Sequence, residues 1–294
     1  MLNMSVSIIG CGWLGQALAQ RLLASNINII ASYQSSETLE KLNELNIPAT
    51  QLILPLVDDV MASNCLDNIA GVDLRLFQQD VLIIAIPPQL KKGRLDYQLK
   101  IQQLVHLAEL GSTQHIILLN STAIYNGLVG RVDEASQLAL KAEKVTSLLA
   151  AEQAVKTFTK RVHILRLAGL VGPNRHPGKF LQAKRVFDNA SAAVNLVHQT
   201  DVVNIIEKLI NYDSADSKKS TYNVVSNTDS DRRGYYQAAA QVLSLPVPKF
   251  SEEQQQNSGK KIMGETLRRE LAYAYRHDDL LSWLKDSSHM LNKT

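Results

Sequence analysis

Residues 6–15 read VSIIGCGWLG, and this stretch decides the fold. An apolar run, VSII, comes directly before three glycines in the pattern G-x-G-x-x-G, and a helical pattern continues from Trp13 to Ser25. A strand, this glycine pattern and a helix at the start of a βαβ unit are typical of dinucleotide binding. The alternative is that the turn has only a structural role and binds no nucleotide. The position of the pattern in the first βαβ unit favours the dinucleotide.

Each glycine of the turn has its own expected part. Gly10 makes the tight turn out of the strand, Gly12 lets the backbone approach a pyrophosphate, and Gly15 lets the helix pack closely on the strand. The helix would offer N–H groups and the positive end of its dipole to the phosphates. Cys11 is expected to pack under the loop, with a redox thiol as the alternative. The predicted cofactor-binding residues of the turn are Gly10, Cys11, Gly12, Trp13, Leu14 and Gly15.

The end of the second strand bears on which dinucleotide binds. An acidic residue there would bind the adenosine ribose of NAD, but IIASYQSS (29–36) holds neither an acid nor the Arg that is usual for NADP. The serine hydroxyls at 32, 35 and 36 could instead receive a 2′-phosphate. We therefore expect NADP or NAD as the cofactor, with NADP preferred. The predicted contacts are Ser32, Tyr33, Gln34 and Ser35.

Short apolar runs alternate with helical patterns through the first two thirds of the chain. The apolar residues are continuous, which is typical of strands covered on both faces. Alternating strands and helices predict parallel βαβ units with right-handed crossovers. The predicted fold class is therefore α/β, a Rossmann doubly wound sheet of about six or seven strands. The predicted strands after the first are 27–31, 50–54, 80–86, 115–120 and 162–167, and the predicted long helices are 95–110 and 136–159.

The last third of the chain has a different character. A turn-rich loop, GPNRHPG (172–178), precedes polar connections at 214–220 and 251–261 and several short elements. This pattern predicts a small C-terminal α/β lobe that is not independent of the first. The expected division is an NAD(P)-binding Rossmann domain at 1–170, with returning segments near 195–225, and an interleaved substrate-binding lobe at 171–294.

Composition and charge limit the classes of binding partner that we expect for this protein. The net charge of +3 and the lack of a Lys- or Arg-rich run argue against nucleic acid and an anionic membrane. The apolar runs are strand-sized, so we expect no membrane span. With two cysteines and no signal-peptide pattern, we expect a cytoplasmic protein. The seven histidines show no metal-binding spacing, so we predict no metal.

Later segments resemble those of one family, in the same order. LLNSTAIYNGLVGRVDEAS (118–136) is similar to the family's S-T-S-x-Y-G … DE, and RLAGLVGPNRHPG (166–178) to its R-x-x-x-x-Y-G-P. VNLVHQTDVV, TYNVVSN and KIMGETLRRELAY match further segments, so the resemblance covers nearly the whole chain. The chain is identified as a member of the extended short-chain dehydrogenase/reductases, the NAD-dependent epimerase/dehydratase superfamily. GWLG, RLAGLVGP and VNLVH together resemble its YeeZ-like atypical group.

The resemblance implies a catalytic set from which this chain departs. Ser121 matches the family's Ser and would hydrogen-bond a substrate carbonyl or hydroxyl. The Tyr and Lys positions of the family's Y-x-x-x-K are Lys144 and Leu148 here, and no Y-x-x-x-K occurs in this region. Tyr125 could replace the acid, as could Lys144 if burial favoured its uncharged form. The alternatives are a wall beside the nicotinamide for Tyr125 and a solvated Lys144. The family also usually has G-x-x-G-x-x-G rather than this glycine turn.

The resemblance also implies further contacts. Segments after the fourth, fifth and sixth strands should lie against the nicotinamide half of the cofactor; the residues are Ala85, Ile86, Pro87, Leu119, Asn120, Leu167 and Gly169. A cation on the GPNRHPG loop would suit a phosphate or carboxylate, and an exposed structural loop is the alternative. His198 is expected to order a helix start rather than to catalyse. The predicted substrate-binding residues are Thr122, Asn174, Arg175, His176 and Asn195.

Two functions of different classes are consistent with these residues. One is an NAD(P)-dependent oxidoreductase, epimerase or dehydratase that acts on a small or nucleotide-linked carbonyl or hydroxyl substrate with a degenerate Tyr-Lys site. The other is a catalytically inactive NAD(P)-binding sensor or regulator, which the loss of the Tyr and Lys favours. A third interpretation is a soluble protein whose site is vestigial. Family members often dimerise through the helices matched by 95–110 and 136–159, so a homodimer is a hypothesis.

Overall fold

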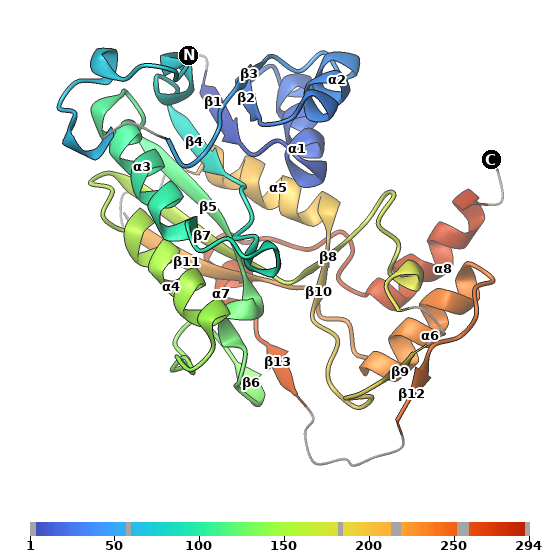
Figure 1. Ribbon diagram of the computed structural model, residues 1–294. Helices are drawn as coiled ribbons and strands as arrows, with labels where there is room; N and C mark the ends of the chain where they lie inside the picture. Colours follow the sequence, from blue (N-terminus) through green and yellow to red (C-terminus); the bar gives the residue numbers. More distant parts are fainter. Residues whose placement is uncertain (1–3, 57–59, 182–184, 213–218, 252–258, 292–294) are drawn as a thin grey trace. The chain divides into compact units, whose positions relative to one another are not determined.

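A seven-stranded sheet in the order β11-β7-β5-β4-β1-β2-β3 organises the chain (Figure 1). The structure is a computed structural model and describes residues 4–56, 60–181, 185–212, 219–251 and 259–291. Strands β3, β2, β1, β4 and β5 pair in parallel with their neighbours. The order reverses beside β1, where the chain turns back to add β4. The predicted Rossmann doubly wound fold is therefore confirmed.

The strands of this sheet are short and buried. Val6, Ile8 and Ile9 of β1 are almost fully covered, and so is every residue of β4. Cover on both faces explains why the apolar runs do not alternate. The strands are β1 (Ser5–Ile9), β2 (Asn28–Tyr33), β3 (Ala49–Gln51), β4 (Val81–Ile84), β5 (His115–Ser121), β7 (Arg161–Leu167) and β11 (Lys219–Val224).

Helices cover both faces of the sheet. Because βαβ crossovers are right-handed, α1 and α2 lie on one face, and α3 and α4, whose crossovers run in the opposite direction, lie on the other. Figure 1 shows α3 and α4 side by side, across the sheet from α1. The helices are α1 (Trp13–Ala24), α2 (Ser36–Glu44), α3 (Tyr97–Leu110), α4 (Glu143–Val155) and α5 (Gln199–Ile210).

One predicted helix is shorter than its sequence pattern. The pattern predicted a helix over 136–159, whereas α4 spans Glu143–Val155. Ser136 belongs to a local turn instead: its Oγ donates to Asp133 Oδ1 at 2.9 Å and accepts from Asp133 N–H. Ser and Asp side chains that bind nearby backbone in this way compete with helix formation.

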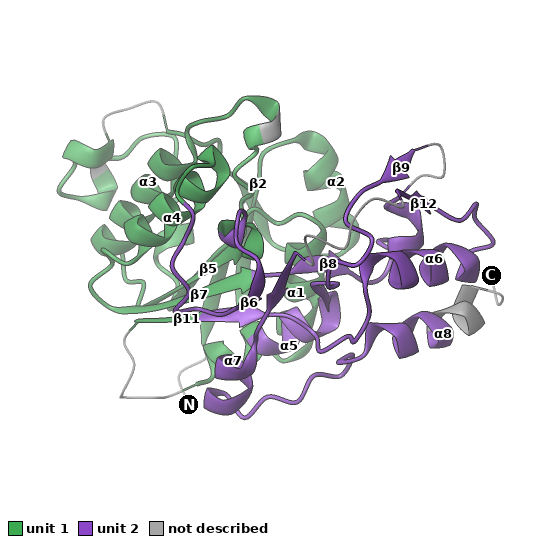
Figure 2. Cartoon of the chain, turned by 90° about the horizontal axis from the view of Figure 1, so that it is seen from below, with its two compact units in different colours: residues 1–124, 140–166, 206–221 green, residues 125–139, 167–205, 222–294 purple. Residues whose placement is uncertain are grey.

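The chain divides into two compact units (Figure 2). Unit 1 comprises 1–124, 140–166 and 206–221, and unit 2 comprises 125–139, 167–205 and 222–294. Unit 2 contains three two-stranded parallel sheets, β10-β8, β12-β9 and β13-β6. Division of the chain into domains at residue 170 stays a prediction. The remaining strands and helices are β6 (Gly130–Val132), β8 (Gly169–Val171), β9 (Val186–Phe187), β10 (Leu196–His198), β12 (Lys249–Phe250), β13 (Lys260–Ile262), α6 (Arg232–Val242), α7 (Glu265–Glu270) and α8 (Leu280–Leu291).

Short 3₁₀ helices connect several of these elements. Two of them carry predicted site residues, η5 (Thr122–Tyr125) after β5 and η6 (Pro177–Lys179) in the GPNRHPG loop. The others are η1 (Val60–Ala62), η2 (Leu66–Asn68), η3 (Leu74–Phe77) and η4 (Leu90–Lys92).

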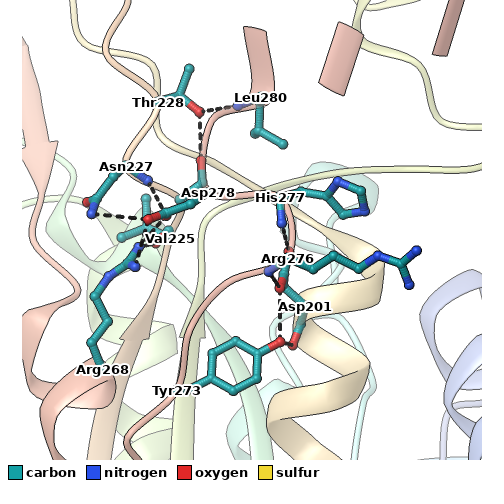
Figure 3. Close-up of polar contacts among 11 residues, drawn as sticks. Asp201, Val225, Asn227, Thr228, Arg268, Tyr273, Arg276, His277, Asp278 and Leu280 are labelled. Carbon is teal, nitrogen blue, oxygen red and sulfur yellow. Dashed lines mark hydrogen bonds and ion pairs between the residues drawn. The ribbon is translucent and has the colours of Figure 1, made fainter. Parts of the chain in front are cut away.

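A buried carboxylate holds the segment between α7 and α8 in unit 2 (Figure 3). Asp201 is fully buried and accepts from the Tyr273 hydroxyl at 2.9 Å and from the backbone N–H groups of Arg276 and His277 at 2.6 and 3.0 Å. These bonds satisfy a buried charge, which would otherwise be costly. Nearby, Arg268 pairs with Asp278 at 2.6 Å.

Candidate functional site

The turn after β1 requires a glycine at its first position. Gly10 has φ +90, and an added Cβ would lie 2.8 Å from Ile86 Cγ2 and 3.1 Å from the carbonyl carbon of Ala85. Both the backbone angle and the neighbouring chain therefore exclude a side chain. The Ala85–Ile86 segment follows β4, so the glycine turn and the predicted nicotinamide-side segment are in contact.

The other two glycines differ in what surrounds them. A Cβ at Gly15 would lie 3.2 Å from Gly10 O and 3.3 Å from Cys11 Sγ, so the start of α1 packs tightly on the turn, as predicted. Around Gly12, no heavy atom of the described residues lies within 4 Å of an added Cβ. Packing therefore does not require glycine at position 12, and approach of a ligand to the backbone there stays a prediction.

Helix α1 begins at this turn without a side-chain cap. Gly12 is its N-cap residue, and Gln16 N–H donates to Gly12 O at 2.8 Å. The first N–H groups of an α-helix generally lack partners within the helix itself. The first turn also carries no acidic residue. Such a helix start is suited to an anion.

Cys11 is a packing residue. Its side chain is 1% exposed, and burial raises the pKa of the thiol to about 12. A thiol with this pKa does not form the thiolate that redox chemistry needs. Trp13 and Leu14, which complete the predicted turn residues, are half-buried at the start of α1.

The end of β2 is bonded to the glycine turn through one serine. Gly10 N–H donates to Ser32 Oγ at 3.0 Å, and Cys11 N–H donates to Ser32 O at 3.2 Å. Tyr33 is half-buried, Gln34 is exposed, and Ser35 caps α2 by accepting from Thr38 N–H. Positions 32–35 carry no charged side chain, and their contact with the adenosine end of a dinucleotide stays a prediction.

The ends of β4 and β5 lie in the same unit as the turn. Ala85 N–H donates to Ile9 O at 2.8 Å, which extends the pairing of β4 with β1. Ile86 is half-buried and Pro87 exposed, whereas Leu119 and Asn120 are buried. These positions stay predicted nicotinamide contacts.

Behind the end of β5 lies a buried polar network. The Asn120 Nδ2 group donates to Glu152 Oε1 at 2.7 Å, and the Arg166 guanidinium binds both oxygens of Glu152 at 2.8 and 2.7 Å. All three side chains are at most 5% exposed. The network joins β5, α4 and β7. The sequence interpretation missed Glu152 and Arg166, although each is a charge inside an otherwise apolar run.

The positions that match the family's Tyr and Lys carry no buried acid. Lys144 is exposed in the first turn of α4, so the burial on which its proposed role depended is absent. Leu148 is 1% exposed and packs in the core of unit 1. Ser121, at the end of β5, is half-buried, and its Oγ accepts from Ala123 N–H at 3.1 Å; Thr122 beside it is buried.

Tyr125 lies in unit 2 and is fully buried. Its hydroxyl donates to Asn223 Oδ1 at 2.8 Å. Asn223 in turn donates from Nδ2 to Met263 O, and its N–H donates to Glu134 Oε1. Neither Asn223 nor Glu134 was predicted. Burial raises the pKa of the Glu134 carboxyl, although its hydrogen bonds oppose this.

The substrate-side residues on the GPNRHPG loop face different surroundings. Asn174 is exposed with φ +59, a conformation that asparagine tolerates. Arg175 is exposed; its Nε donates to Leu170 O, and the guanidinium lies 5.6 Å from the Phe180 ring centre. His176 caps η6 by accepting from Gly178 N–H at 3.1 Å. A loop with an exposed cation is thus formed, and its ligand stays a prediction.

The other predicted residues of unit 2 have structural contacts. Leu167 ends β7, and a Cβ on Gly169 in β8 would lie 2.6 Å from Leu196 Cδ2, so that glycine allows β8 and β10 to pair. The Asn195 amide donates to Lys260 O and accepts from Ile262 N–H, which fixes β13. His198 Nδ1 accepts from Thr200 N–H at 3.2 Å, which confirms that it orders the start of α5.

No group of three or more His, Cys, Asp or Glu side chains in the described part of the chain could hold a metal ion. Among the described helices, none combines the length and the apolar character that crossing a membrane requires.

Comparisons with known proteins agree with this geometry. Residues 4–156 match the family model of the UDP-glucose/GDP-mannose dehydrogenase family, NAD binding domain. The chain is 31% identical over 279 residues to Protein YeeZ of Escherichia coli (strain K12), covering 94% of this chain and 97% of the relative.

Solved structures share the fold. UDP-glucuronic acid 4-epimerase from Bacillus cereus, in complex with UDP-glucuronic acid and NAD, has a TM-score of 0.73 at 15% identity, covering 99% of each chain. UDP-N-acetylglucosamine 4-epimerase from Bacillus cereus has a TM-score of 0.70 at 15% identity, covering 99% of this chain and all of that one. The sequence match to Protein YeeZ confirms the resemblance to the YeeZ-like group of the extended short-chain dehydrogenase/reductases. The chain therefore belongs to the YeeZ family, and its residues 4–156 belong to the NAD-binding domain family of the UDP-glucose/GDP-mannose dehydrogenases.

Proposed function

We propose that this protein binds NADP or NAD and acts as an epimerase, dehydratase or oxidoreductase on a carbonyl or hydroxyl carbon of a small or nucleotide-linked molecule. The observation that carries the cofactor part is the contrast within the glycine turn. Gly10 and Gly15 are needed for packing, whereas an added Cβ at Gly12 would meet no described heavy atom within 4 Å. A glycine that the fold does not need, at an uncapped helix start, favours a pyrophosphate there.

The residues of unit 1 would hold the cofactor along one edge of the sheet. The start of α1 would bind the pyrophosphate, and the end of β2 the adenosine ribose. The segments at Ala85–Pro87 and Leu119–Asn120 would lie against the nicotinamide. When bound, the cofactor supplies a hydride acceptor or donor.

Ser121 is the residue that would position the substrate. Its Oγ accepts from Ala123 N–H, and this bond leaves the hydroxyl proton available to be donated. A donor held by a backbone bond is oriented in advance toward a carbonyl oxygen. Ser121 also ends β5, and in doubly wound sheets ligands bind at the carboxyl ends of the strands.

A nucleotide-linked sugar is the substrate class that the neighbours favour. The two Bacillus cereus structures carry the names of UDP-sugar 4-epimerases. In this chain, the exposed guanidinium of Arg175 could bind a diphosphate or a carboxylate.

A second candidate function is an NAD(P)-binding sensor without hydride chemistry. Lys144 is exposed and Leu148 is buried and apolar, so α4 carries no buried proton donor at the two matched positions. The Tyr125 hydroxyl is hydrogen-bonded to Asn223. Loss of the acid with the glycine turn kept intact is the pattern expected of such a sensor.

The preference for NADP rests on the uncharged end of β2. A carboxylate there would repel a 2′-phosphate, and positions 32–35 carry none. The Ser32 hydroxyl accepts from Gly10 N–H and keeps its own proton to donate. Exposed Gln34 and Ser35 add further donors.

Dinucleotide titration of the full chain tests the cofactor part. NADPH and NADH are titrated separately by calorimetry and by tryptophan fluorescence, with Trp283→Phe isolating the signal of Trp13. We expect saturable binding that is lost in Gly12→Ala, while circular dichroism and thermal unfolding show that the variant is folded. Absence of binding to either dinucleotide by folded wild-type protein would refute the proposal.

Substrate assays separate the two candidate functions. Near-ultraviolet nicotinamide absorbance is followed with UDP-sugars and small carbonyl compounds, and sugar products are analysed for epimerisation. An activity that Ser121→Ala abolishes, with dinucleotide affinity unchanged, supports the enzyme. Tight dinucleotide binding without turnover of any of these compounds supports the sensor.

A homodimer remains part of the proposal. Three exposed leucines, Leu95, Leu99 and Leu140, lie close in sequence to the starts of α3 and α4, and Leu95 is 72% exposed. Exposed apolar side chains grouped in this way are typical of interaction surfaces. We expect a dimeric mass by light scattering that falls to a monomer in Leu95→Glu/Leu99→Glu; a monomeric wild type would contradict the dimer.

A further inference from the structure

Unit 2 contains a pocket that none of the predicted site residues lines. Its volume is about 340 Å³, and it lies beside strands β6 and β13. Four segments line it: these two strands, the stretch before β10 and the loop before α6. All four belong to unit 2, so the pocket is described within one compact unit.

Two cations stand side by side in this pocket. Arg131 and Lys261 are register partners in the parallel pair β6–β13, and both line the pocket. Like charges at opposite positions of a strand pair repel each other and destabilise the pair. An oxyanion between them would turn this repulsion into attraction, and guanidinium groups match oxyanions with two parallel N–H bonds.

The two carboxylates that line the pocket, Asp229 and Asp231, form no short ion pair with these cations. Asp229 Oδ1 lies 4.0 Å from Lys261 Nζ, but the Asp229 side chain is fully exposed, so solvent weakens the pair. Asp231 Oδ1 is engaged as the N-cap of α6, accepting from Gly234 N–H at 2.7 Å. Among the described residues, none forms an ion pair with Arg131, so its guanidinium donors are available to a ligand.

The contacts of Lys260, next to Lys261 in the sequence, differ from those of Lys261. Lys260 is one residue earlier in β13, and its side chain therefore points to the other face of the strand pair. There its Nζ donates to Asn126 Oδ1 at 2.7 Å. The fold thus provides a close partner for Lys260, whereas within the described part of the chain Lys261 pairs with Asp229 alone, at 4.0 Å.

We propose that this pocket binds an oxyanion, the phosphate or carboxylate group of a small hydroxylated molecule, between Arg131 and Lys261. The hydroxyl of Ser191 lines the same pocket and would donate to the anion or to a neighbouring hydroxyl of the ligand, whereas the Ser230 hydroxyl already donates to Asp231 O at 3.1 Å. The volume lies at the small end of the range for ligand sites. The proposal does not depend on dinucleotide binding, because the glycine turn belongs to unit 1.

A footprinting experiment on the full chain tests the pocket at one residue. The wild-type protein is treated with an arginine-specific dicarbonyl reagent, with and without saturating inorganic phosphate or acetate, and peptides are quantified by mass spectrometry. We expect the anion to slow modification of Arg131 by about tenfold, while exposed Arg269 reacts at an unchanged rate. Equal rates at Arg131 with and without both anions would overturn the proposal.

Variants test the same pocket by calorimetry with inorganic phosphate and with acetate. Arg131→Gln and Lys261→Gln should each weaken binding about tenfold. Lys249→Gln is the matched control, since it removes an exposed lysine from another short parallel strand of unit 2. Gly12→Ala removes phosphate binding at the glycine turn and should leave the pocket's affinity unchanged. Equal weakening by Lys249→Gln, or no weakening by either pocket variant, would overturn the proposal; a preference for phosphate or for acetate identifies which group the pocket takes.

Discussion

The Tyr125 hydroxyl donates to Asn223 Oδ1 at 2.8 Å, across 98 positions of sequence. Both side chains are fully buried in unit 2. The Asn223 amide also donates to Met263 O, so one asparagine joins η5, β11 and the segment before α7. A hydroxyl held in this way contributes to the stability of unit 2 whether or not it also takes part in chemistry.

Tyr125→Phe should therefore lower stability before it lowers affinity. The change leaves the Asn223 carbonyl oxygen without its donor in a buried site, which costs about 1–3 kcal/mol. Urea unfolding measures the loss, and dinucleotide titration of the same variant should give an unchanged dissociation constant. Asn223→Ala and the double variant complete a cycle that isolates the pair. An unchanged unfolding midpoint together with lost turnover would instead assign Tyr125 to catalysis.

The fold was predictable because it depends on patterns that are local in sequence. The apolar runs, the glycine turn and the alternation of strands with helices predict parallel βαβ units with right-handed crossovers. The order of the strands in the sheet was not predicted. The glycine turn was predictable for the same reason, since Gly10, Gly12 and Gly15 act within one strand-turn-helix segment.

The contacts of the site residues that the sequence did not predict are made with partners distant in sequence. Nothing near Asn195 indicates that its amide binds the backbone of β13, 65 and 67 positions away. Similarly, the sequence around Ser32 does not show that its hydroxyl accepts from Gly10 N–H. Arg131 and Lys261 were not recognised because only strand pairing brings two isolated surface cations together.

Two alanine substitutions in the glycine turn should separate stability from binding. Gly10→Ala forces a side chain into a positive φ and against Ile86, so we expect the free energy of unfolding to fall by about 2 kcal/mol or more. Gly12→Ala meets no described heavy atom within 4 Å, and should change stability by less than about 1 kcal/mol. Chemical denaturation measures both. A larger loss from Gly12→Ala than from Gly10→Ala would contradict the geometry of the turn.

The buried ion pair behind β5 should be costly to break from one side. Arg166→Met leaves the Glu152 carboxylate buried with Asn120 as its remaining described donor, and should cost about 3–5 kcal/mol. Adding Glu152→Gln should restore most of the loss, because the unpaired charge is gone. Arg75→Met is the control: that pair with Asp73 is as short, 2.6 Å, but its arginine is 70% exposed, so the midpoint should barely move. Equal losses in both variants would show that burial does not matter here.

The neighbouring histidines of β5 and β7 should make stability fall in acid. His115 Nε2 lies 2.7 Å from His163 Nδ1, and burial lowers the pKa of both rings below the ordinary value of 6.5. Repulsion from His163 and Arg161 lowers the pKa of His115 further, and repulsion from Arg161 lowers that of His163. Below pH 6.5 the unfolded chain therefore takes up protons that the folded chain does not, and the free energy of unfolding falls as pH falls. Each histidine contributes up to about 1.4 kcal/mol per pH unit. Urea unfolding between pH 7 and 5 should show a flatter slope in His115→Phe/His163→Leu than in wild type; parallel slopes would contradict the shift.

Coenzyme choice should respond to a single charge at the end of β2. Gln34→Asp places a carboxylate where an acidic residue would accept from the ribose hydroxyls of NADH, and the same carboxylate repels the 2′-phosphate of NADPH. Gln34 is exposed, so the fold should tolerate the change. We expect the ratio of NADPH to NADH affinity to fall about tenfold, as measured by calorimetry. The control is Gln20→Asp, which makes the same charge change at an exposed residue of α1. If Gln34→Asp leaves the ratio unchanged while both dinucleotides still bind, the adenosine ribose does not lie at the end of β2, and discrimination must be sought elsewhere in unit 1.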